Sequence, residues 1–312
     1  MADDASGDAS GDVTPGDPRL VADTHCHTGE GPLYHPDEEV VYFLDIPPAD
    51  LYRYDPADGS HERVLDAGGA IGGFTVQDDG DLLLFCDEGR VQPWSPADGL
   101  GDPVVDSIDG RGEFRFNDVI ADPRGRVYAG LMHQTAPAEH PGALYRLDTD
   151  GSLTRLETDL PIPNGMGFTP DRRELYFTET VEGVIYRYDY DQATGGLSDR
   201  ELFLDTDDVS GNPDGMTVDA EGHVWSAFWD GERLARYSPD GEELARVEFP
   251  AKKVSCVTFG SSDYETAYVT TALGPGEGEP GTRDEEGAGA GALFAVDLAV
   301  GGVPEFRSRV EC

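Results

Sequence analysis

The stretch ELYFTETVEGVIYRYDYDQATG, at residues 174–195, contains two runs of aromatic and β-branched residues separated by a turn. Such runs, bounded by Gly and Asp, are typical of short strands joined in hairpins. Runs like its first half recur with starts 41 to 49 residues apart: VVYFLDI at 40–46, DLLLFC at 81–86, RVYAGLM at 126–132, HVWSAFW at 223–229 and TAYVTTA at 266–272. Each is followed by a second run that ends in a turn, such as LYRYDPADG at 51–59 and LARYSPDG at 234–241.

Six units of about 45 residues predict an all-β, six-bladed β-propeller, in which each unit forms a four-stranded blade around a central channel. A β-sandwich also has short strands at regular spacing, but it does not explain a six-fold repeat. No segment of 10–15 residues keeps a helical period, which argues against parallel α/β folds.

We expect a single propeller domain at residues 20–312 and a disordered acidic tail at residues 1–19. The small and charged residues of this tail cannot offset the entropy lost on ordering. The stretch at 274–291 mixes Gly, Glu and Pro, and we expect it to form a long, mobile surface loop.

The composition excludes several classes of partner. The chain has 22 basic and 63 acidic residues, a net charge of −41. This charge argues against nucleic acid and anionic membranes as partners. It predicts a protein that stays soluble in concentrated salt, from a halophilic source, which we expect to be a haloarchaeon. Since the chain has neither an apolar run long enough to cross a membrane nor a signal sequence, we expect it to be cytoplasmic.

The repeats share a register. Counting back eight residues from the turn glycines Gly80, Gly125 and Gly222 reaches Gly72, Asn117 and Asp214, and the other units reach Glu30, Asn164 and Ser255. Equivalent positions of radial blades form a ring, so Glu30, Asn117, Asn164 and Asp214 are expected to converge on the axis. These oxygen ligands suit a hard divalent cation such as Ca²⁺, Mg²⁺ or Mn²⁺. The alternative is that they are only turn formers.

Four ordered segments carry a family resemblance: GEGPLYHP at 29–36, FRFNDVIADPRGRVYAGLM at 114–132, PNGMGFTPDRRELYFTET at 163–180 and NPDGMTVDAEGHVWSAFWDG at 212–231. The chain resembles the senescence marker protein, regucalcin and gluconolactonase family of six-bladed propellers. The resemblance implies a divalent metal held by Glu30, Asn164 and Asp214, and substrate contacts from Arg115 and Asn117. The chain departs from the family at Tyr34, usually Trp, and at His133, Gln134 and Thr135, where many sugar lactonases carry acidic residues.

The resemblance implies metal-dependent hydrolysis of a sugar lactone such as gluconolactone, xylonolactone or arabinolactone. In this hypothesis Asp214 also accepts a proton from the attacking water, and the metal is Ca²⁺, Mn²⁺, Mg²⁺, Zn²⁺ or Fe²⁺. We expect a small-molecule partner and a monomer or small homo-oligomer. Two alternatives stay open: a non-catalytic propeller that binds a protein partner, and another hydrolase or synthase reaction on this scaffold.

Other polar groups give weaker signals. The cysteines, Cys26, Cys86, Cys256 and Cys312, form no CxxC pair, so they indicate neither a zinc site nor a disulfide framework. His25 and His27 border the expected tail and are interpreted as incidental. His133 and His140 flank a Pro-containing segment that we interpret as a solvated loop.

Overall fold

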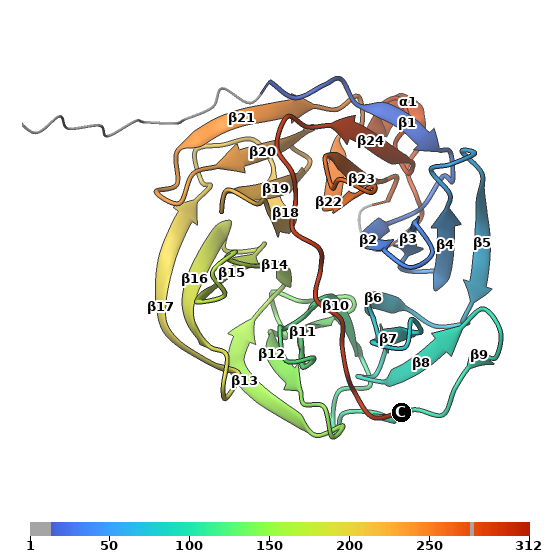
Figure 1. Cartoon of the computed structure of the whole chain (residues 1–312), viewed down its shortest axis with the longest axis vertical. Coiled ribbons are helices and arrows are strands. Elements are labelled where there is room, and N and C mark those ends of the chain that lie inside the picture. The colour runs from blue at the N-terminus through green and yellow to red at the C-terminus, as the bar shows by residue number, and fades with distance from the viewer. Residues whose placement is uncertain (1–13, 275–277) are drawn as a thin grey trace, which may run out of the picture.

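The predicted all-β, six-bladed propeller is confirmed. The computed structural model describes residues 14–274 and 278–312, and these residues form 24 strands and one short helix. The strands make six four-stranded antiparallel sheets arranged around an axis (Figure 1). No helix in the described part of the chain is long and apolar enough to cross a membrane.

The first five blades follow one another along the chain. Blade 1 consists of β2 (Gly29–His35), β3 (Val40–Asp45), β4 (Asp50–Tyr54) and β5 (His61–Asp66), and blade 2 of β6 (Ile71–Val76), β7 (Leu82–Cys86), β8 (Val91–Ser95) and β9 (Gly99–Leu100). Blade 3 consists of β10 (Phe114–Ala121), β11 (Val127–His133), β12 (Gly142–Leu147) and β13 (Leu153–Leu160). Blade 4 consists of β14 (Pro163–Phe168), β15 (Glu174–Glu179), β16 (Val184–Asp191) and β17 (Gly196–Asp205), and blade 5 of β18 (Asn212–Val218), β19 (Val224–Trp229), β20 (Arg233–Tyr237) and β21 (Glu243–Glu248).

Blade 6 joins the two ends of the chain. It consists of β22 (Lys253–Gly260), β23 (Thr266–Ala272), β24 (Leu293–Asp297) and, as its outer strand, β1 (Arg19–Ala22). Of the tail expected at 1–19, residues 1–13 lie outside the described residues, whereas Gly16 N donates to Asp297 O at 2.9 Å and Arg19 pairs with Ala295. This pairing closes the ring and covers the outer edge of β24.

The core lies between neighbouring blades. Every residue of β3 and β7 is buried, which explains why these strands read as continuous apolar runs. One cluster, for example, packs residues of β3 and β4 against residues of β6, β7 and β8. The outer strands β5, β17 and β21 are largely exposed and carry the acidic surface.

Two buried aspartates fix the turns from which the register was counted. Asp122 accepts hydrogen bonds from Arg126 N at 3.0 Å and Arg126 Nε at 2.6 Å. Asp219 accepts from His223 N at 3.0 Å and Arg236 Nε at 2.8 Å, and both aspartate side chains are fully buried. Each carboxylate therefore holds the hairpin that joins the first strand of its blade to the second.

Two further segments leave the repeat. The C-terminal residues cross the propeller axis (Figure 1), and Ser308 N donates to Val76 O while Arg309 N donates to Gly125 O, both at 2.9 Å. The stretch expected as a surface loop at 274–291 contains the helix α1 (Arg283–Glu286), and residues 275–277 lie outside the described residues. Its end is not on the surface, because Ala290 is fully buried.

Candidate active site

The predicted register positions all lie on the first strands of the blades, which line the axis (Figure 1). Each of these strands has an irregularity in its pairing at that position: next to Glu30 in β2, Gly72 in β6, Asn117 in β10, Asn164 in β14, Asp214 in β18 and Ser255 in β22. A bulge bends the strand and redirects its side chains. The repeated irregularity therefore turns equivalent side chains toward a common space.

That space is a cavity of about 480 Å³ at one end of the axis. It is bordered by Glu30, Asn117, Asn164 and Asp214, the four residues expected to converge, and also by Arg115, while the roles of all five stay predictions. The other lining residues are Thr28, Ile46, Met132, Gln134, Thr135, Pro137, Ile162, Thr180, Val181, Asn212, Trp229 and Asp230. Apolar walls with a few polar groups are typical of small-molecule sites.

Hydrogen bonds hold the polar side chains of the cavity in place. Arg115 Nη1 donates to Asn117 Oδ1 at 2.7 Å, and Asn117 Nδ2 donates to Pro163 O at 3.1 Å. Asn164 Nδ2 donates to Thr180 Oγ1 at 2.9 Å and also to Asp214 Oδ1. Blades 3, 4 and 5 are thus joined at the site, and the functional atoms are preorganised.

Three carboxylates meet at the floor of the cavity. Glu30 and Asp214 are buried, and Asp118 follows Asn117 in β10. Burial raises the pKa of Glu30 and of Asp214 well above the ordinary values, and the charge of Asp118 adds to both effects. Burial also raises the pKa of Asp118 to about 7, whereas the nearby Arg115 guanidinium opposes the rise. Packing three such groups together is costly unless a cation is bound among them.

The charges and donors fit a divalent cation. Three carboxylates against the single guanidinium of Arg115 leave an excess of two negative charges when all are ionised. In addition, the Asn164 side chain contacts Asp214 through its Nδ2, and its amide oxygen accepts from Gly165 N at 3.1 Å. The predicted set thus consists of carboxylate and amide oxygens, which are hard donors. A second set consists of Glu30, Asp118 and Cys256, whose ligand atoms all lie within 4.8 Å of one another. It lies deeper, because Asp118 and Cys256 do not line the large cavity.

The sequence interpretation missed Asp118 and Cys256. Each directly follows a register position, Asn117 or Ser255. In a regular strand, neighbouring side chains point to opposite faces. Counting equivalent positions therefore selects the register residue and not the residue that follows it. The bulge brings both toward the axis, and such a bulge could have been suspected from the paired polar residues in RFND.

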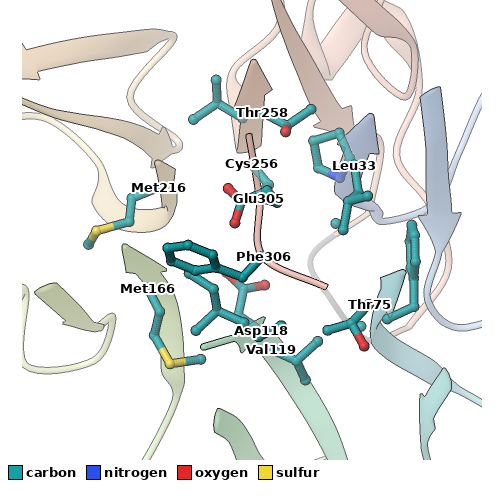
Figure 2. A pocket seen from close by; sticks show the side chains of 17 residues that line it. Leu33, Thr75, Asp118, Val119, Met166, Met216, Cys256, Thr258, Glu305 and Phe306 are labelled. Atoms are coloured by element: carbon teal, nitrogen blue, oxygen red, sulfur yellow. The ribbon is translucent and has the colours of Figure 1, made fainter. Parts of the chain in front are cut away.

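Below the cavity the channel narrows to a second, small space of about 60 Å³. Figure 2 shows Asp118 and Cys256 at this space together with Glu305 and Phe306 of the C-terminal segment, which close it from the far side. Burial raises the pKa of Glu305 to about 7, although a hydrogen bond from Thr217 opposes this rise. Glu305 is therefore largely protonated in the folded protein at mildly acidic pH.

We expect Glu305→Gln to stabilise the protein at alkaline pH only. Because the pKa of Glu305 is about 7 when folded and near 4.5 when unfolded, the native state holds more protons in this window, and stability falls as pH rises through it. Removing the charge should add up to about 3 kcal/mol near pH 8 and almost nothing near pH 4. Guanidinium unfolding at both pH values checks this, with the exposed Glu311→Gln as control; an equal effect at both pH values would contradict it.

The histidines form no part of the large cavity. His25 is exposed, whereas His27 contacts Thr28 Oγ1 and Gly278 O, at 2.9 and 2.8 Å. His133 is buried and accepts hydrogen bonds at Nδ1 from Thr135 N and Ala136 N; its ring centre lies 4.9 Å from that of His140. Both rings border a separate hollow, while Gln134 and Thr135 face the large cavity.

Comparisons with known proteins place the chain in a family. Residues 28–273 match the family described as SMP-30/Gluconolactonase/LRE-like region. The chain is similar to pentonolactonase XacC of Haloferax volcanii, with 49% identity over 93% of this chain and 97% of the relative. It is also similar to 6-deoxy-6-sulfogluconolactonase of Pseudomonas putida, with 32% identity over 89% and 93%. Among solved structures it is similar to the calcium-binding protein regucalcin of Agrobacterium tumefaciens, with a TM-score of 0.87, 27% identity and coverage of 95% and 98%.

Proposed function

The chain belongs to the SMP-30/gluconolactonase/LRE-like family and is a sugar lactone hydrolase, and we propose that its preferred substrates are the lactones of five-carbon sugar acids. Xylonolactone and arabinolactone are the expected examples. The observation that carries the proposal is the cavity that brings together Glu30, Arg115, Asn117, Asn164 and Asp214. The 49% identity to a pentonolactonase over nearly the whole of both chains supports the five-carbon class.

The residues of the site suit hydrolysis of a cyclic ester. Water attacks the lactone carbonyl carbon, the ring C–O bond breaks, and the products are a carboxylic acid and a hydroxyl on the same chain. We assign to Asp214 the acceptance of the proton from the attacking water, since its carboxylate faces the cavity and burial raises its pKa. Arg115 and Asn117 orient the substrate hydroxyls, because Arg offers several donors and Asn both a donor and an acceptor.

Glu30, Asn164 and Asp214 are the residues that we assign as ligands of a divalent cation. Such a cation supplies polarisation of a carbonyl and lowers the pKa of a coordinated water. Its identity stays among Ca²⁺, Mn²⁺, Mg²⁺, Zn²⁺ and Fe²⁺. Ligand atoms of Asp118 and Cys256 lie within 4.8 Å of one from Glu30, so these two residues are direct neighbours of the proposed set.

We expect the purified protein to consume base in a pH-stat when xylonolactone or arabinolactone is added. The specificity constant should exceed that for gluconolactone by about tenfold, the effect of roughly one additional carbon in a fitted pocket. Chelator should abolish the activity, and added divalent cation should restore it. The assays belong in concentrated KCl, because the net charge of −41 predicts a salt-adapted protein. Hydrolysis no faster than the spontaneous rate on all three lactones would overturn the proposal.

A further inference from the structure

A buried lysine joins three elements at the rim of the large cavity. Lys253 begins β22 and its side chain is only 8% exposed. Its Nζ lies 3.1 Å from Asp230 Oδ1, in the turn between β19 and β20, and it also pairs with Glu286 of α1. The same Nζ lies 5.9 Å from the centre of the Trp229 ring.

The lysine stays charged in this setting. Burial lowers the pKa of Lys253, but the hydrogen bonds to Glu286 and Asp230 outweigh this effect and raise the pKa overall. A buried ammonium between two carboxylates keeps both of them in place, because removing it leaves like charges facing each other. Blade 5, blade 6 and α1 are therefore tied together by a single cation.

Asp230 is held in an unfavourable backbone conformation. Its φ is +58°, in the left-handed region that non-glycine residues rarely adopt, and Glu232 in the same turn has φ +56°. Such conformations persist where the surrounding structure enforces them, and they are frequent at ligand sites. Here the enforcing contacts are the Lys253 ion pair and the backbone bonds of Glu232, whose N–H donates to Lys252 O at 3.0 Å.

Asp230 also differs from the other acidic residues of the cavity. Three carboxylates line it, those of Glu30, Asp214 and Asp230, and the first two belong to the proposed cation site. The side chain of Asp230 is 53% exposed, and its ion pair with Lys253 is made through Oδ1 at 3.1 Å. Asp230 and the apolar Trp229 both line the large cavity, so this exposed carboxylate offers acceptor oxygens there.

We propose that Asp230 contacts substrate, accepting hydrogen bonds at Oδ2 from hydroxyl groups of the sugar lactone, and that Lys253 is a positioning residue that holds this carboxylate. The inference rests on the proposed function, because it takes a sugar lactone as the occupant of the cavity. A carboxylate is a strong acceptor for hydroxyl donors, and the fixed Oδ1 leaves one oxygen oriented for this contact. Asp230 then binds the polyol part of the substrate, away from the reacting carbonyl.

The first test compares Asp230→Asn with the unchanged protein on xylonolactone and arabinolactone. We expect KM to rise about tenfold to a hundredfold, the usual cost of losing a hydrogen bond to a charged group, with kcat within about twofold. Isothermal titration with Mn²⁺ should give the same affinity for both proteins. With the unmodified protein, KM for the 2-deoxy or the 3-deoxy lactone should be higher than KM for the parent lactone by a similar factor. With Asp230→Asn, removing the hydroxyl group should change KM little.

The second test separates positioning from simple stabilisation. Lys253→Met should raise KM like Asp230→Asn, and Lys253→Arg should partly restore it. The matched control is Lys252→Met, because Lys252 is the adjacent and exposed lysine. If Lys253→Met fails to fold, the Asp230→Asn result decides. If the unmodified protein is active and Asp230→Asn has the same KM, this inference alone is overturned. If the unmodified protein is inactive on every sugar lactone, the proposed function and this inference are overturned together.

Discussion

Replacing Asp214 by asparagine will reduce lactone turnover about a thousandfold while the protein remains folded. A positioned general base contributes about 10²- to 10⁴-fold to a rate, and an amide cannot accept the proton of the attacking water. The amide oxygen of the variant can still accept the hydrogen bond from Asn164 that Asp214 Oδ1 accepts, so the geometry of the site should survive. The measurement is kcat in the pH-stat, with circular dichroism to verify the fold.

The control for this variant is Asp171→Asn. Asp171 lies in the turn between β14 and β15 of blade 4. Its side chain is 59% exposed and does not line the large cavity. We expect its activity to equal that of the unchanged protein. Full turnover by Asp214→Asn with a divalent cation still bound would show that Asp214 is not the base.

Replacing Glu30 by glutamine will weaken divalent cation binding about a hundredfold or more. The three carboxylates and Arg115 leave two negative charges for the cation, and the substitution removes one of them without changing the size of the side chain. Breaking a buried charge interaction typically costs about 3–5 kcal/mol, which corresponds to this loss of affinity. Isothermal titration with Ca²⁺ and Mn²⁺, and the rise in melting temperature on adding each ion, measure the effect.

Further variants locate the cation within the site. Asn164→Ala should weaken binding, whereas Cys256→Ser should bind as the unchanged protein does, because only Asn164 belongs to the proposed ligand set. Glu38→Gln, outside the large cavity, is the control for loss of a carboxylate. Loss of binding in Cys256→Ser with retention in Asn164→Ala would instead place the ion in the deeper set with Glu30 and Asp118.

Much of the fold and half of the site were predictable because a propeller is a local repeat. The first five blades pair strands that follow one another in the chain, so short-range patterns such as ELYFTET and the Asp219 turn contain the information for one blade. Equivalent positions then share an axis by symmetry. This is why Glu30, Asn117, Asn164 and Asp214, far apart in the chain, could be expected in one cavity.

Contacts that do not repeat were not predictable in this way. The pairing of β1 with β24, the crossing of the axis by the C-terminal segment and the burial of Ala290 all involve segments with no counterpart in other blades. The pairing of Lys253 with Asp230 and Glu286 likewise depends on how two neighbouring blades and α1 meet.

By itself, then, the sequence determined the number of blades, the order of the consecutive strands within them and the register that lines the axis, since these follow from local periodicity. Only the tertiary structure decided which residues beside that register also face the axis, because bulges bring Asp118 and Cys256 inward against the alternation of a regular strand. It also decided which acidic residue outside the proposed cation ligands borders the large cavity. Charge alone does not separate Asp230 from the other acids of the chain; its place at the large cavity and its buried lysine partner do.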